Sequence, residues 1–317
     1  MRIVVIGSGV AGLTAARALA GEEHEVTVLD KGRRPGGRLA TRELAGSARA
    51  DHGAQFFTAR SERFRETVAG WLARSAVHEW CRGFSSQDGH PRYAAGGGMA
   101  QLAALLAADL DVRQSVRVDA ATSQPGGTWR VGWPAAHGHG AGSIIADALV
   151  VSAPAPQAAA LLDGQASVPE LAYAPALALM LALDRTPAIA WPGAVQLAHD
   201  ATFTWVADNL AKGVSRVPSL TLHTRPDVAE RLWPQDDAAL LARLSASAAP
   251  WLGGARIVGA AVHRWRYAMP LRQYPERCAL AADGRVVLAG DAFGEPRVEG
   301  AFLSGLAAAA SLSPLAR

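Results

Sequence analysis

The stretch Gly7-Ser8-Gly9-Val10-Ala11-Gly12 follows a β-branched run over residues 2–6 and precedes an Ala- and Leu-rich run over residues 13–20. A second β-branched run over residues 25–29 then ends at Asp30. Short apolar runs of this kind are typical of parallel strands that are buried on both faces. The order of strand, glycine turn, helix and strand predicts a βαβ unit that binds a dinucleotide.

Each glycine of this turn has a mechanical task. Gly7 permits the tight turn, Gly9 lets the backbone approach a pyrophosphate, and Gly12 lets the helix lie close to the sheet. The phosphates are expected at the helix N-terminus, so Val10 and Ala11 join the predicted binding residues.

Asp30 lies 18 residues after Gly12, where its carboxylate is placed to accept hydrogen bonds from ribose hydroxyls, with Lys31 beside it. The βαβ unit by itself does not distinguish FAD from NAD.

Composition excludes several classes of protein. The 317 residues are half hydrophobic and 19% charged, which is enough apolar material for a buried core and rules out disorder. The net charge of +3 is spread along the chain, so no nucleic-acid partner is expected. Interruptions in every apolar run argue against a membrane span.

Cysteine and histidine spacing points away from disulfides and metal. Cys81 and Cys278 are too few and too far apart for a disulfide framework or a thiolate zinc site, so a reducing, cytoplasmic location is expected. His137 and His139 have a metal-like spacing, but they lack the further ligands that such a site needs. A hairpin loop without metal is therefore predicted there. The protein is expected to be a monomer or a homodimer.

The loop after Asp30 contains Gly36-Gly37-Arg38, which resembles the signature of the flavin amine oxidase superfamily. The resemblance implies that Arg38 approaches the FAD pyrophosphate, and a guanidinium fork suits phosphate oxygens. The segment Gly53-Ala54-Gln55-Phe56 is similar to one that passes along the flavin in that superfamily. Gln55 and Phe56 are accordingly expected to border the isoalloxazine.

The C-terminal region resembles the closing FAD motif of the same superfamily. A strand expected over residues 285–289 ends in Gly290-Asp291, and Gly300-Ala301-Phe302 precedes a small-residue helix expected over 303–312. The resemblance implies that Asp291 binds the ribityl chain and that the helix directs its N-terminus at the flavin. FAD is thus the predicted cofactor, held without a covalent bond because neither cysteine lies in an attachment motif.

The predicted fold is α/β. A Rossmann-like FAD-binding domain, with a parallel sheet and a small antiparallel meander, is joined to a second, α+β substrate domain, as in amine oxidases and p-hydroxybenzoate hydroxylase. Residues 112–118 and 128–133 are expected as meander strands, with Val116 near the adenine, and 146–152 as a strand returning to the main sheet. The predicted FAD-binding domain comprises residues 1–59, 92–154 and 280–317, and the substrate domain comprises residues 60–91 and 155–279.

Two further segments resemble the renalase-like flavoproteins. They are residues 205–212, which contain Asp-Asn-x-x-Lys, and residues 218–224, which contain Pro-Ser-Leu-x-x-His-Thr; the segment His263-Arg264-Trp265-Arg266-Tyr267 resembles a third. The resemblance marks Trp205, Asn209, His223 and Trp265 as candidate substrate-site residues. Lys212, in the first segment, is the only lysine outside the N-terminal unit, and its place there suits a role other than holding a water beside the flavin.

The resemblance implies an oxidase that converts misreduced 2- and 6-dihydro isomers of NAD(P)H to NAD(P)+, with oxygen reduced to hydrogen peroxide. Loss of hydride from a dihydropyridine gives an aromatic cation directly, so no strong base is required. One alternative is an amine oxidase, with Phe56, Trp205 and Tyr267 as an aromatic cage. Another is a flavin-binding carrier or scaffold without turnover of a small molecule.

Overall fold

The computed structural model describes residues 1–84, 89–135, 140–282 and 284–313, so His137 and His139 lie outside the described residues. The chain divides into two compact units, which are described separately. Unit 1 consists of Met1–Gly37, Ala103–Ala172 and Pro270–Arg317, and unit 2 consists of Arg38–Leu102 and Tyr173–Met269.

These units differ in extent from the predicted domains. Residues 38–59 and 92–102 belong to unit 2, because β4 (Arg49–Asp51) packs against two strands of the unit 2 sheet and β6 (Arg92–Ala95) pairs with β5 (Val77–Cys81). Residues 155–172 and 270–279 belong to unit 1, where α4 (Ala155–Leu162) packs on a meander strand.

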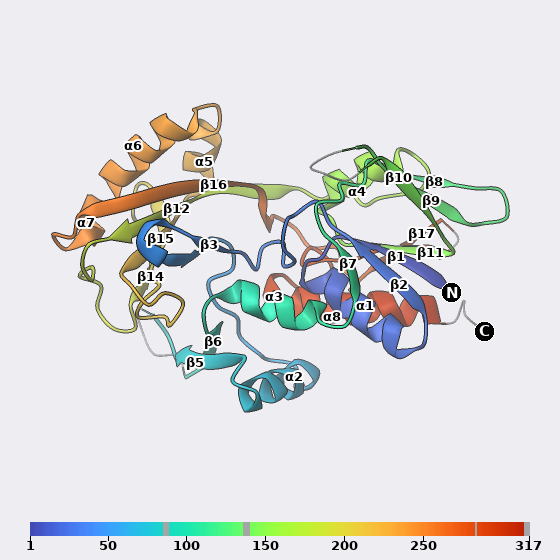
Figure 1. The fold of residues 1–317 in the computed structure, drawn as a ribbon, viewed down its shortest axis with the longest axis horizontal. Helices are drawn as coiled ribbons and strands as arrows, with labels where there is room; N and C mark the ends of the chain where they lie inside the picture. Colours follow the sequence, from blue (N-terminus) through green and yellow to red (C-terminus); the bar gives the residue numbers. More distant parts are fainter. Residues whose placement is uncertain (85–88, 136–139, 283, 314–317) are drawn as a thin grey trace. The chain divides into compact units, whose positions relative to one another are not determined.

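Unit 1 contains a six-stranded sheet in the order β17-β18-β11-β1-β2-β7 (Figure 1). Its strands are β1 (Arg2–Ile6), β2 (Glu25–Leu29), β7 (Asp111–Arg113), β11 (Ala148–Val151), β17 (Ala279–Ala281) and β18 (Val286–Leu288). All neighbours are parallel except the antiparallel pair β17 and β18. Because the chain leaves β1 for β2 on one side and β11 lies on the other, the strand order reverses at β1, where open α/β sheets bind ligands.

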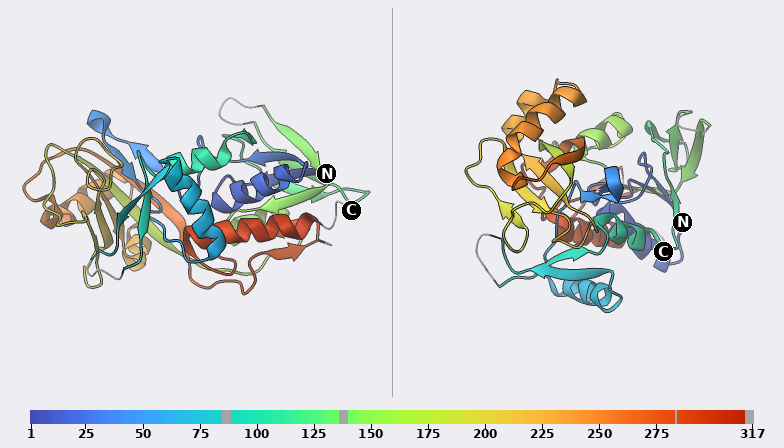
Figure 2. Two further views of the ribbon diagram at one scale, coloured as in Figure 1. Left: turned by 90° about the horizontal axis from the view of Figure 1, so that it is seen from below. Right: turned by 60° about the vertical axis from the view of Figure 1, so that its left-hand side comes forward.

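The helices of unit 1 complete the predicted βαβ arrangement. Helix α1 (Val10–Gly21) connects β1 to β2 and lies alongside α8 (Arg297–Leu312), as Figure 2 shows in blue and red. Apolar side chains from β1, β2, β11 and both helices form one buried core. The predicted Rossmann-like fold class is therefore confirmed, including the bounds of the first two strands.

Two predictions for unit 1 are corrected. Residues 112–118 do not form a meander strand, since 111–113 pair with β2 as the edge of the parallel sheet and 114–119 are irregular. The meander has three antiparallel strands: β8 (Ala120–Ser123), β9 (Trp129–Trp133) and β10 (Gly142–Ala146). The last helix begins at Arg297 rather than 303, because the chain enters it directly after Pro296.

Unit 2 is built on a five-stranded sheet in the order β13-β14-β15-β12-β16. Its strands are β12 (Tyr173–Leu183), β13 (Ala194–Gln196), β14 (Phe203–Asp208), β15 (Ser219–Thr224) and β16 (Ile257–Pro270). Helices α5 (Pro226–Leu232), α6 (Asp237–Ser247) and α7 (Ala249–Leu252) cover one face, where Leu220 and Leu222 join their apolar side chains (Figure 1).

Shorter elements complete the described chain. They are β3 (Thr41–Glu43), which pairs with β4; the 3-10 turn η1 (Ala45–Ser47); α2 (Glu62–Ala73); and α3 (Met99–Ala107). None of the helices in the described ranges is long and apolar enough to cross a membrane. Neither Cys81 nor Cys278 forms a disulfide bond.

The contact between α1 and α8 gives a test of the fold. A Cβ at Gly305 would lie 2.3 Å from the carbonyl oxygen of Ala11, so Gly305→Ala forces the two helices apart. We expect it to lower the free energy of unfolding by roughly 1–3 kcal/mol in urea titrations. At Gly70 in α2 a Cβ meets nothing within 4 Å, so Gly70→Ala should gain roughly 0.5–1 kcal/mol. Equal stability of Gly305→Ala and the wild type would contradict the close packing of these helices.

Candidate functional site

The glycine turn of unit 1 is shaped to receive an anion. Helix α1 begins with Gly9 as its N-cap, with no side-chain cap and no acidic residue in its first turn, so backbone N–H groups are the donors offered there. A Cβ at Gly9 would meet nothing within 4 Å, which leaves open space against the backbone. The turn therefore fits a pyrophosphate, and the predicted role of Gly7, Gly9 and Gly12 in holding one stays a proposal.

Asp30 holds this turn from the end of β2. One carboxylate oxygen accepts hydrogen bonds from the backbone N (2.5 Å) and Oγ (2.8 Å) of Ser8, and the other accepts from the N of Gly32 (2.6 Å). Ser8 and Gly32 are partners that sequence reasoning did not find. Asp30 thus organises the turn, and its predicted contact to a ribose stays a proposal. Its neighbour Lys31 is exposed.

The Gly36-Gly37 loop folds back onto the same turn. The N of Gly36 donates to the O of Ser8 at 2.8 Å, and a Cβ at Gly37 would lie 3.5 Å from the Cα of Gly9. Arg38 follows directly as the first residue of unit 2, where its guanidinium donates to the O of Ala268.

The C-terminal motif of unit 1 depends on the start of α8. The N of Gly290 donates to Oγ of Ser304 at 2.9 Å, which joins the loop containing Asp291 to the helix. A Cβ at Gly300 would lie 1.8 Å from the O of Glu295, so the loop before the helix passes directly over its first turn. Ala301 and Phe302 follow within α8, and not in a loop before it.

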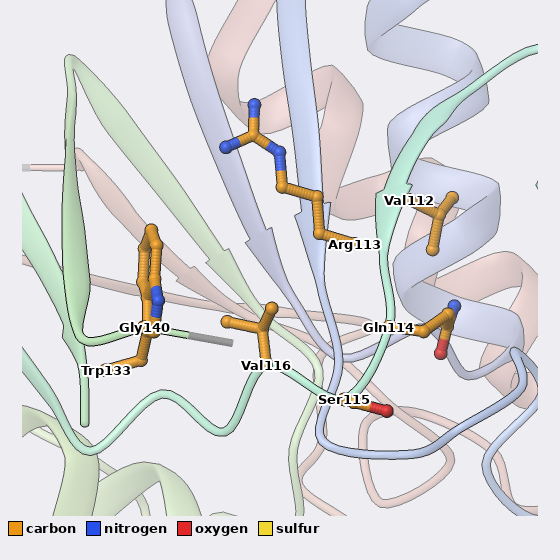
Figure 3. Close-up of a pocket in the computed structure, with 7 residues that line it drawn as sticks. All are labelled: Val112, Arg113, Gln114, Ser115, Val116, Trp133 and Gly140. Carbon is orange, nitrogen blue, oxygen red and sulfur yellow. The ribbon is translucent and has the colours of Figure 1, made fainter. Parts of the chain in front are cut away.

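Val116 lines a cavity of about 620 Å³ in unit 1 (Figure 3). Its backbone N donates a hydrogen bond to the O of Asp30. Trp133 of the meander lines the cavity too, as do residues 112–115 and Gly140. The side-chain amide of Gln114 is buried and has no hydrogen-bond partner among the described residues. The role of Val116 as an adenine contact stays a proposal.

The second group of candidate residues lies on the face of the unit 2 sheet that the helices leave uncovered. Trp205 on β14 and His223 on β15 are directly opposite each other. Their sequence neighbours Val206 and Leu222 point into the helix-covered core, so Trp205 and His223 point to the other face. On β16, Arg264 pairs with Asp237 on the helix side. Because side chains alternate along a strand, Trp265 lies on the uncovered face with His223.

A single carbonyl group connects two of the renalase-like segments, residues 218–224 and residues 263–267. The O of His52 accepts a hydrogen bond from Nε1 of Trp265 at 2.7 Å and lies 3.2 Å from Nε2 of His223. Since a carbonyl oxygen only accepts, Nε2 of His223 carries the proton and Nδ1 is left as an acceptor. The His52 ring also stacks on the Trp265 indole, with centroids 5.4 Å apart.

Asn209 and Gln55 are enclosed by the protein. Asn209 is fully buried; its Nδ2 donates to Oγ1 of Thr221 at 3.1 Å and its Oδ1 accepts from the N of Asp51. Gln55 donates to the O of Asp51 and the O of Gly53. Both amides are occupied by protein partners, so we propose that they position the site rather than touch a ligand.

Trp205 lies in a cluster of aromatic rings. Its indole contacts Phe84 edge-on at 4.7 Å between centroids and lies 5.6 Å from Phe56 and 6.3 Å from Trp80. Trp205 is buried, whereas Trp265 is partly exposed. Of the two indoles, Trp265 is therefore the one we propose to contact a substrate. Gly53 and Ala54 lead into this cluster, and the N of Ala54 donates to the O of Arg38.

Burial makes the histidines of this face weak bases. It lowers the pKa of His52 to about 3, and the neighbouring His263, His223 and Arg42 lower this pKa further. Burial also lowers the pKa of His223 to about 4, although its hydrogen bond to His52 opposes the change. The pKa of His263 is lowered for the same reason. All three imidazoles are neutral at pH 7, and they offer hydrogen bonds rather than charge.

Sequence reasoning assigned no role to Asp51, His52 or His263 and left that of Lys212 open. Lys212 and Asp51 are both fully buried and form an ion pair of 2.7 Å. The signals were present, because Asp51 and His52 directly precede the glycine of the flavin-like segment and Lys212 is one of two lysines. No group of three or more metal-binding side chains occurs in the part of the chain that is described.

Comparisons with known proteins agree with this arrangement. Residues 5–71 match the model of an NAD(P)-binding Rossmann-like domain, and residues 59–313, more than half of the chain, match the model of flavin containing amine oxidoreductases. The chain therefore belongs to the flavin containing amine oxidoreductase family. This membership makes it a flavin-dependent oxidoreductase and confirms the prediction of FAD as its cofactor.

Individual relatives are distant or match only in part. An L-amino-acid oxidase from Daboia russelii is 56% identical over 39 residues, and one from Crotalus adamanteus is 55% identical over 40. The matched part spans 12–13% of this chain and 8% of each relative.

Two solved structures share the fold over their whole length. One, from Exiguobacterium sp. 255-15 and provisionally assigned as a protoporphyrinogen oxidase, has a TM-score of 0.75 at 14% identity and covers 100% of this chain and 99% of its own. Putrescine oxidase bound to putrescine has a TM-score of 0.65 at 14% identity, with 100% of both chains covered.

Gly9→Val tests the cofactor turn. Its backbone angles (φ −73°, ψ 178°) are open to any residue and its Cβ direction is empty, so the protein should fold normally. The added side chain would occupy the space of the pyrophosphate, and the Kd for FAD should rise at least tenfold, about 1.4 kcal/mol. Flavin absorbance after desalting and the Tm of the apoprotein measure the two effects. Gly21→Val, at the other end of α1, is the control and should keep normal flavin content. Normal flavin content in Gly9→Val would show that the phosphates lie elsewhere.

The neutral histidines predict how stability depends on pH. The pKa of His52 is depressed in the folded state, so the unfolded chain binds more protons below about pH 6.5 and stability falls as pH falls. Between pH 7 and pH 5 this one residue should cost about 2 kcal/mol. Urea unfolding of the wild type and His52→Gln at both pH values measures it. The wild type should lose more stability than the variant, and an equal loss would contradict a neutral, buried His52.

Proposed function

We propose that the chain is an FAD-dependent oxidase of the 2- and 6-dihydro isomers of NAD(P)H, which it converts to NAD(P)+. The reaction consumes one oxygen and one proton and releases hydrogen peroxide. The substrate is a dihydronicotinamide dinucleotide, and FAD is held without a covalent bond. A cytoplasmic location is part of the proposal, since the sequence offers no disulfide framework.

The observation that carries the proposal is the weak basicity of the candidate site. His223, His52 and His263 have lowered pKa values, and Lys212 is tied to Asp51 in a buried ion pair. These groups orient a substrate by hydrogen bonds and provide no strong base. Such a site suits a donor that needs no deprotonation, and hydride loss from a dihydronicotinamide forms an aromatic cation directly.

Each residue has a proposed task. When bound, FAD would supply the two-electron oxidation, and the residues of the site would hold and orient the substrate. Nδ1 of His223 accepts a hydrogen bond from the carboxamide N–H of the substrate, because its Nε2–H is directed at the O of His52. The partly exposed indole of Trp265 stacks on the dihydropyridine ring. Trp205 supports Phe56 beside the reacting ring.

For the cofactor, we propose that the turn of Gly7 to Gly12 and Arg38 hold the pyrophosphate. Gly53, Ala54, Phe56 and the start of α8 are assigned to the flavin, with Asp291 on the ribityl chain, while Gln55 positions the segment from within the protein. Asp30 and Lys31 are assigned to the ribose, and Val116 to the adenine.

Oxidation of a small amine is the second candidate. The family description and the likeness to putrescine oxidase favour it. An amine would have to bind in its neutral form against aromatic rings such as Phe56, Trp205 and Tyr267. Asp51 is already paired with Lys212, and Asp208 accepts hydrogen bonds from backbone N–H groups, so neither buried carboxylate is placed to bind a substrate ammonium ion.

Turnover in air separates the candidates. The purified protein is mixed with the 2-, 4- and 6-dihydro forms of NAD and NADP, and separately with putrescine, benzylamine and L-amino acids, while oxygen uptake and hydrogen peroxide are measured. We expect turnover with the 2- or 6-dihydro forms and one peroxide for each NAD(P)+. Turnover with amines alone would favour the second candidate, and no turnover with any donor would favour an electron carrier.

His223→Ala tests the proposed substrate contact. Loss of one hydrogen-bond partner should weaken substrate binding or slow flavin reduction by roughly 1–3 kcal/mol, without abolishing reduction. Anaerobic rapid mixing gives both quantities, and FAD content should be normal. His199→Ala changes an exposed histidine of the same unit and serves as the control. Complete loss of reduction with intact binding would give His223 an obligatory chemical role and contradict the base-free reaction.

A further inference from the structure

The ion pair between Lys212 and Asp51 is unusual because both side chains have no exposed surface. Nζ of Lys212 lies 2.7 Å from Oδ2 of Asp51, and it also lies over the Trp80 ring at 5.5 Å from the centroid. Removing two charges from water is costly, so such a pair is poor evidence for a gain in stability. A role in placing neighbouring groups is the better explanation.

Asp51 is held by groups from several elements. Its Oδ1 accepts hydrogen bonds from Oγ1 of Thr41 (2.6 Å) and the N of Met99 (2.9 Å). Its backbone O accepts from Oγ1 of Thr221 at 2.8 Å, and its N donates to Oδ1 of Asn209 at 3.3 Å. The position of Asp51 is therefore fixed relative to β3, α3 and β15.

Lys212 also determines how the Gln55 amide is oriented. Nζ of Lys212 donates to Oε1 of Gln55 at 3.3 Å, so the amide nitrogen must face the other way. That nitrogen donates to the O of Asp51 at 2.7 Å and to the O of Gly53 at 3.2 Å. Residues 51–55 are thus closed into a loop by one side chain, and the cation orients that side chain.

His52 lies inside this loop, and its carbonyl oxygen accepts hydrogen bonds from His223 and Trp265. We propose that Lys212 is a positioning residue: paired with Asp51, it fixes Gln55 and the 51–55 loop so that the O of His52 selects the Nε2–H form of His223 and orients Trp265. The consequence for substrate binding rests on the proposed function. The effect on the His223 tautomer is independent of the proposed function.

The test is the paired variant Asp51→Asn with Lys212→Met, studied without substrate. Removing both charges avoids leaving one of them buried alone, so the chain should fold. The ring ¹⁵N shifts of His223 report its tautomer, and the signal is assigned with His223→Gln. We expect a single Nε2–H form in the wild type and a mixture of both neutral tautomers in the paired variant. His199, which is exposed, should keep the same signal in both.

Gln55→Met is the matched second variant, because it removes the amide and keeps the ion pair. It should also produce mixed tautomers of His223. If the paired variant does not fold, the tautomer measured in Gln55→Met tests the proposal. In the loaded enzyme, both variants should slow the limiting rate of flavin reduction about tenfold while the Kd for substrate changes less than about twofold. A single, unchanged Nε2–H tautomer in folded Gln55→Met would overturn the proposal, as would an Nδ1–H form in the wild type.

Failure of the proposed function gives a different result. If no dihydronicotinamide isomer reduces the flavin, the assignment of substrate fails while the tautomer measurement still tests the role of Lys212.

Discussion

The buried Asp51–Lys212 ion pair is the constraint on which the candidate site of unit 2 depends. Asp51 ends the short strand β4, and its carboxylate and backbone are bonded by residues from β3, α3 and β15. The next residue, His52, presents one carbonyl oxygen to both His223 and Trp265. The site is therefore organised by acceptors and donors that are fixed before any ligand binds, which lowers the cost of orienting one.

Unit 1 offers backbone N–H groups to its proposed ligand, whereas unit 2 offers the side chains of His223 and Trp265. The glycine turn offers helix N–H groups and open space, and Asp30 holds it through Ser8 and Gly32. This difference explains why the cofactor turn could be predicted from the sequence more readily than the site of unit 2. A turn that depends on glycine geometry leaves a readable spacing, so the βαβ unit, its strand bounds and the FAD cofactor were predicted correctly.

The site of unit 2 was harder to predict, because its contacts join residues that are far apart in sequence. Asn209 and His223 were singled out together, yet the structure encloses Asn209 and leaves His223 partly exposed. Neither the Lys212–Asp51 pair nor the His223 tautomer has a local pattern that could reveal it. The prediction of the first meander strand failed for a related reason. Residues 111–113 suit a strand of either sheet, and only their pairing with β2 shows that they belong to the parallel sheet.

The limiting rate of flavin reduction as a function of pH tests the central claim, which is hydride transfer from a dihydronicotinamide without a catalytic base. It is measured anaerobically with the 6-dihydro isomer from about pH 5.5 to 8.5, a range in which His223, with its pKa lowered to about 4, stays neutral. The account predicts a rate that is constant over this range. A rate that falls about tenfold for each pH unit below an apparent pKa of about 6 to 7 would reveal a required base and contradict it.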